Sequence, residues 1–322
     1  MDAAPEHARP GGYERLLEMT AGGVPESTVV IHPCTAAAID AVMAAAEAGL
    51  IRPILVGPIA KVQNAAEKAG KDISSFRLIA ALHSHDAAAK GVQLIGSGEA
   101  KLLMKGSLQT EELMSAVVSP ASGMRTERRI SHAYVMDVPG RRRPLIITDG
   151  AVNIAPTLEE KADIVRNAID LAHVIGIEQP RVAILSAIET VNPAIQSTLD
   201  AAALCKMADR GQISGGILDG PLALDNAISE AAANEKGIRS EVAGRAEILV
   251  VPNLEAGNIL AKELTFIGGA DAAGVVLGAR VPIVLTSRAD SLRTHLASCA
   301  LAVLMARAAT KAAPGFMPVY NG

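Results

Sequence analysis

The chain has 322 residues and a mass of 33.1 kDa. Half of its residues are apolar and its net charge is −4, which excludes a largely disordered chain and a strongly basic nucleic-acid-binding protein. Aromatic residues make up only 2% of the chain, which also argues against a surface on which nucleic-acid bases stack.

The cysteines and the N-terminal sequence indicate where the protein acts. Cys34, Cys205 and Cys299 lie far apart and form no CxxC pair, which favours a reducing compartment over a disulfide framework or a cysteine-based zinc site. The first sixteen residues lack a signal-peptide pattern, and no apolar run is long enough to cross a bilayer. We therefore expect a cytoplasmic protein with no membrane partner.

Short apolar segments alternate with helical patterns along most of the chain. The segments predicted as strands are 27–33, 53–56, 76–81, 102–104, 134–138, 144–148, 182–186, 216–218, 248–251 and 281–286. The segments predicted as helices are 36–48, 86–94, 110–118, 158–174, 195–208, 222–233, 254–266 and 291–309. Thr157 and Glu160 form a capping-box pattern ahead of the helix at 158–174.

This alternation predicts an α/β fold with a mostly parallel sheet, in which ligands gather at the carboxyl ends of strands. Most of the predicted strands are continuous apolar runs, as expected where helices cover both faces of a sheet. Segment 119–143 is rich in arginine and in small turn residues, so we place a domain junction there.

The standard catalytic motifs are absent from the sequence. It contains no P-loop, GxGxxG, HExxH or GxSxG pattern. His83 and His85 are spaced as possible metal ligands, but two histidines one residue apart after a strand are more often surface residues. We predict no metal site.

Two glycine-containing segments follow predicted strands in the second half of the chain. In 215–225, Asp219 and Gly220 precede a proline, a pattern typical of a sharp turn with a helix cap. In 250–258, Asn253 is placed as a helix N-cap. Gly257 and Asn258 are poor helix formers in the turn that follows, so they indicate either close approach of a ligand or close packing of the backbone.

Two further strand ends carry groups that bind anions. Segment 282–291 delivers Ser287, Arg288 and Ser291 to the start of a long helix, where backbone N–H groups, hydroxyls and a guanidinium favour phosphate. The alternative is simple helix capping with the arginine paired in solvent. Lys105 ends the strand at 102–104 and is a second phosphate candidate, although a lysine there is by default a surface residue.

Together these segments resemble the phosphate acetyltransferase/phosphate butyryltransferase family. Five segments carry the resemblance, in order: 103–106 (Leu-Met-Lys-Gly), 148–154 (Thr-Asp-Gly-Ala-Val-Asn-Ile), 216–222 (Gly-Ile-Leu-Asp-Gly-Pro-Leu), 252–258 (Pro-Asn-Leu-Glu-Ala-Gly-Asn) and 286–291 (Thr-Ser-Arg-Ala-Asp-Ser). The chain is also similar to the transferase part of proteins that fuse this enzyme to an enoyl-CoA hydratase-like module.

The resemblance implies an enzyme that converts a short-chain acyl-CoA and inorganic phosphate into acyl phosphate and CoA, and the reverse. It implies two three-layer α/β domains of the isocitrate/isopropylmalate dehydrogenase type, with a mostly parallel sheet and a cleft between the domains. Residues 1–143 plus 275–322 would form the first domain, and 144–274 the inserted second one. It also implies a homodimer and no cofactor, since the coenzyme A thioester is a substrate.

The family's serine–arginine pair maps onto Ser287 and Arg288. The resemblance assigns phosphate binding to Arg288 and Ser291, and the acyl carbonyl oxygen or departing sulfur to Ser287. Lys105 and Arg125 are further phosphate candidates. Five more residues would line the coenzyme A side or shape the cleft: Asp219, Gly220, Asn253, Gly257 and Asn258.

The sequence departs from the acetyl-type pattern at two places. Thr294 stands where an aspartate is expected, and Glu111-Glu112 stand where an arginine is expected. Both departures make butyryl-type specificity as plausible as acetyl-type specificity. Two alternatives to the transferase stay open from the sequence: a dehydrogenase of similar fold, and a protein that binds CoA or phosphate without turnover.

Overall fold

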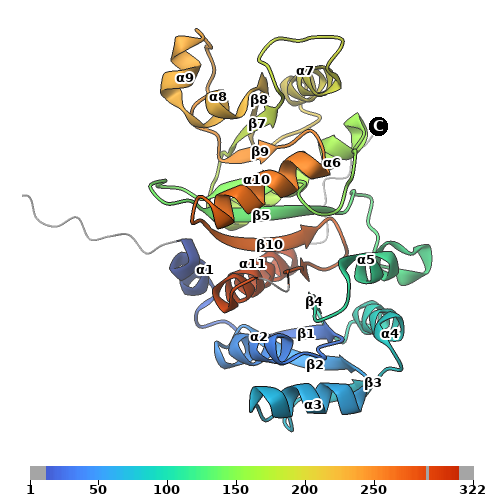
Figure 1. Cartoon of the computed structure of the whole chain (residues 1–322). Coiled ribbons are helices and arrows are strands. Elements are labelled where there is room, and N and C mark those ends of the chain that lie inside the picture. The colour runs from blue at the N-terminus through green and yellow to red at the C-terminus, as the bar shows by residue number, and fades with distance from the viewer. Residues whose placement is uncertain (1–11, 288–289, 312–322) are drawn as a thin grey trace, which may run out of the picture.

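Eleven strands of one mixed sheet run along the computed structural model, which describes residues 12–287 and 290–311 (Figure 1). The strands are β1 (Glu26–Ile31), β2 (Ile51–Gly57), β3 (Arg77–Ala80), β4 (Leu102–Lys105), β5 (Ser131–Asp137), β6 (Leu145–Thr148), β7 (Arg181–Leu185), β8 (Ile217–Leu222), β9 (Ile248–Val250), β10 (Asp271–Leu277) and β11 (Ile283–Val284). Their order in the sheet is β3-β2-β1-β4-β11-β10-β5-β6-β9-β7-β8.

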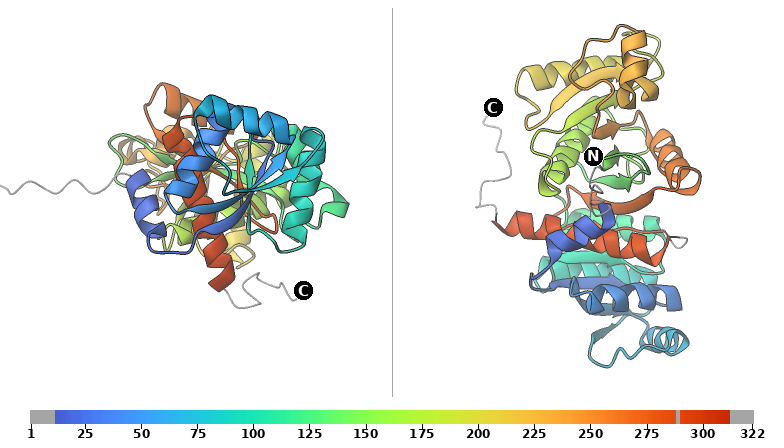
Figure 2. Two further views of the ribbon diagram at one scale, coloured as in Figure 1. Left: turned by 90° about the horizontal axis from the view of Figure 1, so that it is seen from below. Right: turned by 90° about the vertical axis from the view of Figure 1, so that its left-hand side faces the viewer.

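Helices cover both faces of this sheet. They are α1 (Gly12–Thr20), α2 (Ala36–Glu47), α3 (Ile59–Ala69), α4 (Ser84–Gly96), α5 (Thr110–Val118), α6 (Leu158–Val174), α7 (Gln196–Asp209), α8 (Leu224–Ile228), α9 (Glu230–Glu235), α10 (Leu254–Phe266) and α11 (Leu292–Lys311), with a 3-10 turn at Pro120–Ser122. Figure 2 shows α6 and α10 on opposite faces of the sheet. The predicted α/β class is confirmed.

The sheet is mostly parallel, as predicted, but it changes direction in the middle. The β10–β11, β10–β5 and β5–β6 pairs are antiparallel, whereas β1–β2, β1–β4, β4–β11, β2–β3, β6–β9, β7–β9 and β7–β8 are parallel. The block that contains β4 and β11 therefore runs opposite to the block that contains β6 and β9.

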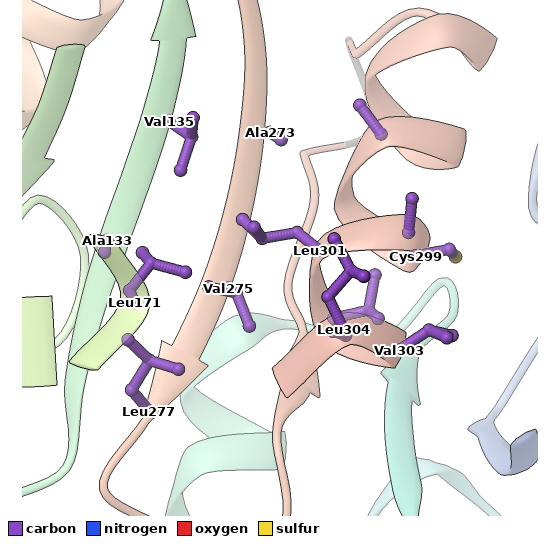
Figure 3. Close-up of a cluster of buried hydrophobic side chains, with 14 of the residues drawn as sticks. Ala133, Val135, Leu171, Ala273, Val275, Leu277, Cys299, Leu301, Val303 and Leu304 are labelled. Atoms are coloured by element: carbon purple, nitrogen blue, oxygen red, sulfur yellow. The ribbon is translucent and has the colours of Figure 1, made fainter. Parts of the chain in front are cut away.

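The core divides according to the face of the sheet. Along β1, Val30 packs with α2 and α11 on one face, while Val29 and Ile31 pack with α4 and α5 on the other. Figure 3 shows Leu301 and Leu304 of α11 facing β10 and β5 within the core cluster that also contains Val30. Small alanines in α11 and α6 let these helices lie close to the strands.

Helix starts follow the capping residues. The Thr157 hydroxyl accepts a hydrogen bond from Glu160 N, and the Glu160 carboxylate accepts one from Thr157 N, so the predicted capping box is confirmed. Asn253 caps α10, where its Oδ1 accepts a hydrogen bond from Ala256 N at 3.0 Å. The predicted bounds of α5, α6 and α10 match the structure.

Several elements differ from the prediction. Strand β10 and helices α1 and α3 were not predicted, and the helix expected over 222–233 is two short helices separated at Ser229. Ser229 ends α8 and caps α9, where its hydroxyl accepts a hydrogen bond from Ala232 N. The strand expected at 216–218 continues as β8 to Leu222. Among the described residues, no helix is both long and apolar enough to cross a membrane.

Candidate active site

The loop after β11 is folded back on itself by its own polar groups. Ser287 N donates to the Asp290 carboxylate at 2.6 Å, and Asp290 N donates to Ser287 O at 3.2 Å. Thr286 is buried, and its Oγ1 lies 2.9 Å from His295 Nδ1. Thr286 is therefore tied to the first turn of α11, and Ser287 is tied to Asp290 just before that helix. Arg288, predicted beside Ser287, lies outside the described residues.

Ser291 takes the capping role that was the alternative to phosphate binding. Its Oγ accepts a hydrogen bond from Thr294 N at 3.1 Å and lies 3.1 Å from Thr294 Oγ1. Thr294 occupies the position where the acetyl-type pattern has an aspartate. In this chain its hydroxyl instead pairs with that of Ser291 at the N-terminus of α11. Phosphate binding by Ser291 stays a prediction.

Lys105 is not a surface residue, because it is only 6% exposed at the end of β4. Its Nζ lies 3.4 Å from the carbonyl oxygens of Gly106 and Leu108. Gly106 has to be glycine, since a Cβ there would lie 2.4 Å from the carbonyl oxygen of Ile31. The turn after β4 is thereby pressed against the end of β1.

A cavity of about 560 Å³ joins the two strand ends. Lys105, Ser107, Thr286, Ser287 and His295 line it, together with residues along α2. Burial lowers the pKa of His295, the Asp290 carboxylate raises it, and Lys105 lowers it. The structure therefore brings together two of the predicted site residues, Lys105 and Ser287, beside a histidine held neutral by its surroundings.

The loop after β6 is wrapped around Asp149. This carboxylate accepts hydrogen bonds from Ala151 N at 2.8 Å, from Val152 N at 3.0 Å and from Asn153 Nδ2 at 2.6 Å. Asp149 is only 3% exposed. Its charge is thus satisfied by the loop itself, so it fixes the shape of the loop.

Gly257 and Asn258 bring α10 against this loop. A Cβ on Gly257 would lie 2.5 Å from the carbonyl oxygen of Asp149, and Asn258 Nδ2 donates to Gly150 O at 3.2 Å. Close backbone packing, one of the two interpretations left open by the sequence, is therefore observed at both residues. A role toward coenzyme A stays a prediction for Gly257, Asn258 and the capping residue Asn253.

His132 and Tyr134 of β5 lie beside these loops, and the sequence did not predict them as site residues. Burial and, to a smaller extent, the Asp290 and Asp149 carboxylates together raise the pKa of Tyr134 to about 12. Tyr134 therefore lies between the Ser287 loop and the Asp149 loop. The His132 ring packs edge-on against it at 4.3 Å between centroids. One signal was available: a His-x-Tyr alternation within a strand puts both rings on one face.

His132 is fully buried, and neither of its ring nitrogens has a hydrogen-bond partner among the described residues. Burial lowers the pKa of His132 to about 4, against the opposing effects of the Asp149 carboxylate and of the nearby Leu285 backbone, which does not reach hydrogen-bond geometry. The ring is neutral near pH 7.

Other predicted residues lie apart from this assembly. Asp219 and Gly220 are in β8 at the outer edge of the sheet, where β10, β5, β6, β9 and β7 separate them from β11. Asp219 Oδ1 accepts a hydrogen bond from Gly220 N at 2.8 Å. Arg125 is exposed, and its backbone pairs with Ala279 in the turn between β10 and β11. Within residues 12–287 and 290–311, no group of three or more His, Cys, Asp or Glu side chains is arranged to hold a metal ion.

Comparison with known proteins decides the family. Residues 78–303 match the model of a family described as phosphate acetyl/butaryl transferase. The chain belongs to this phosphate acetyl/butyryl transferase family.

Two members of the family show the extent of the match. A phosphate acetyltransferase from Rhizobium meliloti is 60% identical over 299 residues, which cover 93% of this chain and 95% of that protein. A phosphate butyryltransferase from Clostridium acetobutylicum is 44% identical over 268 residues, which cover 83% of this chain and 89% of that protein.

Solved structures agree with this placement in the transferase family. A branched-chain phosphotransacylase from Enterococcus faecalis V583 superposes with a TM-score of 0.76 at 28% identity, covering 87% of this chain and 99% of that one. A putative 4-hydroxythreonine-4-phosphate dehydrogenase from Salmonella typhimurium has a TM-score of 0.53 at 13% identity, covering 88% of this chain and all of that one, which shows the fold alone. The expected likeness to a dehydrogenase fold is confirmed in this sense.

Proposed function

We propose that this chain transfers a short acyl group between coenzyme A and inorganic phosphate. Two observations support the proposal. The family model matches residues 78–303 of this chain, and Ser287 and Lys105 line one cavity. The substrates are an acyl-CoA and phosphate, and the products are an acyl phosphate and CoA. The reaction runs in both directions.

The chemistry needs placement more than proton transfer. A phosphate oxygen attacks the thioester carbonyl carbon, a C–O bond forms, and the C–S bond breaks with its electron pair leaving on sulfur. Phosphate is already ionised near neutral pH, and the comparable second pKa of a phosphate ester is about 6, so little help from a general base is needed. The departing thiol resembles cysteine, with a pKa of about 8.5, so it leaves without a strong acid.

Side chains that line the cavity, together with Arg288 next to Ser287 in the sequence, would meet these needs in three ways. Lys105 and Arg288 would hold the phosphate, Lys105 as a point charge and Arg288 as a two-pronged donor. Ser287 would donate to the oxygen that becomes negative in the tetrahedral intermediate, where one donor is worth on the order of 10²–10³ in rate. Holding phosphate against the thioester contributes up to about 7–11 kcal/mol.

The acyl group is acetyl or butyryl in this proposal. The relatives support both, since one at 60% identity is named an acetyltransferase and one at 44% a butyryltransferase. Formation of acyl phosphate from acetyl-, propionyl- and butyryl-CoA, trapped with hydroxylamine, tests the proposal and ranks the chain lengths. Absence of trapped product with all three thioesters would overturn it.

We also propose that the protein acts as a cytoplasmic homodimer with two domains, 1–143 plus 275–322 and 144–274. The three cysteines are free thiols, which suits a reducing compartment. The antiparallel β5 and β10 sit where the two parallel blocks of the sheet meet, which suits a domain boundary near them. Light scattering coupled to gel filtration tests the dimer.

A further inference from the structure

The three consecutive arginines just before β6, at 141–143, are a sequence feature that the proposed reaction does not use. Two of its arginines are engaged: Arg141 Nη2 donates to Ala246 O at 3.0 Å, and Arg143 Nη1 lies 2.5 Å from Glu247 Oε1. Arg142, between them, is exposed and has no side-chain partner among the described residues.

Arg142 faces a cavity of about 490 Å³, here called the arginine cavity. Four of its ten lining residues are arginines, from three separate segments: Arg15 of α1, Arg142 and Arg143 before β6, and Arg181 of β7. Glu178 is the one acidic residue in the lining. Pro144, Ile175 and Ile177 give the cavity an apolar part.

A buried carboxylate holds two of these guanidinium groups in place. Glu247 is 3% exposed, and its Oε1 lies 2.5 Å from Arg143 Nη1 and 3.4 Å from Arg181 Nη1. Its Oε2 accepts a hydrogen bond from Arg181 N at 2.8 Å. One carboxylate neutralises one of the two charges, so the pair keeps an excess positive charge in a fixed geometry.

Arg15 closes the cavity from the side of α1. Its Nη2 donates to the carbonyl oxygen of Ile175, beyond the end of α6, at 3.4 Å. Counting Glu178 and Glu247 against the four arginines leaves two positive charges uncompensated around the cavity. A ligand with at least two negative charges would restore the balance.

The shape and chemistry of the cavity select among anions. Guanidinium groups recognise phosphate through paired N–H donors. A volume of about 490 Å³ lies in the range of roughly 300–1,000 Å³ that holds cofactor-sized ligands, and exceeds what a bare phosphate needs. The apolar residues offer contact to an organic group. We propose that the arginine cavity binds an organic diphosphate, such as a nucleoside diphosphate.

This site is separate from the candidate active site. Arg143 precedes β6 and Asp149 follows it, so the whole strand, itself roughly 13 Å long, lies between them. The proposal therefore does not depend on the proposed acyl transfer, and its test reads binding rather than activity.

The test is calorimetric titration of the full chain with ADP, repeated with inorganic pyrophosphate. We expect Arg142→Ala to weaken ADP binding about tenfold or more, because each charge-assisted contact to phosphate is worth about one factor of ten. Arg142 has no structural partner, so the variant keeps the fold. Arg210→Ala is the matched control, since Arg210 is also exposed and has no side-chain partner among the described residues; it should bind ADP like the unmodified chain.

Three results would overturn the proposal. One is an absence of ADP binding to the unmodified chain. Another is ADP binding that Lys105→Met abolishes and Arg142→Ala leaves intact, which would put the ligand in the candidate active site. The third is binding of pyrophosphate without binding of ADP, which would reject an organic diphosphate in favour of a bare one.

Discussion

Thr286 and His295 share a hydrogen bond of 2.9 Å between Oγ1 and Nδ1. It ties the residue before Ser287 to the first turn of α11, so that the Ser287 loop is held at both ends. The neutral His295 ring makes this contact without adding a charge beside Lys105. Thr286 is thus a positioning residue for Ser287.

Replacing Thr286 tests this relationship. Thr286→Val keeps the shape but removes the hydroxyl, and a neutral hydrogen bond is worth about 1 kcal/mol, so kcat should fall about fivefold. Thr286→Ser restores the hydroxyl and should recover most of the rate. Steady-state kinetics of both variants with saturating phosphate provide the measurement; equal kcat for Val and Thr would remove Thr286 from the positioning of Ser287.

Arg288 is expected to bind phosphate through a two-pronged contact. Arg288→Lys keeps the charge but loses the fork, so it should raise the KM for phosphate more than the KM for acyl-CoA. Initial rates with phosphate varied at saturating acyl-CoA, and the reverse, separate the two constants. An unaltered phosphate KM in this variant would count against the assignment.

Gly257 sets the distance between α10 and the Asp149 loop. Because an added Cβ would lie 2.5 Å from a backbone oxygen, Gly257→Ala should lower the free energy of unfolding by about 1–3 kcal/mol and reduce kcat. Gly96→Ala is the matched control at the end of α4, where a Cβ meets nothing within 4 Å. Urea denaturation of both variants provides the measurement. Similar free energies of unfolding for the two would contradict the prediction and show that α10 can shift away from the Asp149 loop at no cost.

The buried His132 makes stability depend on pH. Above pH 6.5 its ring is neutral in the folded and unfolded states. Between pH 6.5 and about 4 the unfolded chain takes up a proton at this histidine and the folded chain does not. Lowering the pH through this range therefore lowers the free energy of unfolding, by an amount on the order of 3 kcal/mol. Below about 4 the loss levels off.

His132→Leu should therefore flatten the drop in unfolding free energy between pH 6.5 and 4. His85→Leu, at an exposed histidine, is the control and should keep the full drop. Denaturant curves at half-unit pH steps provide the comparison. The same slope in His132→Leu and in the unmodified chain would show that other groups control this range.

Much of the fold was predictable because buried parallel strands are continuous apolar runs. Helices α6 and α10 were located to the residue, since Thr157 and Asn253 cap them. β10 was missed because its Asp-Ala-Ala-Gly start carries little strand signal. The reversal of direction at β5 and β10 depends on which strands pair, which no local pattern records.

The site was predictable where anion-binding side chains follow a strand. Ser287 and Lys105 were predicted in this way, and the structure places both on one cavity. His132 and Tyr134 were not found, because polar rings inside a strand resemble core residues until the two loops around them are placed. The sequence also could not show that Asp219 lies far from Ser287 and Lys105, because that distance depends on the order of the strands in the sheet.

Acyl transfer to phosphate is tested most directly by the release of CoA from acetyl-, propionyl- and butyryl-CoA with and without phosphate, followed with a thiol reagent. We predict release that requires phosphate, and a kcat at least about tenfold lower in Ser287→Ala with CoA binding kept. Release without phosphate would mean thioester hydrolysis instead. No release from any of the three, by a chain that still binds CoA, would contradict acyl transfer altogether.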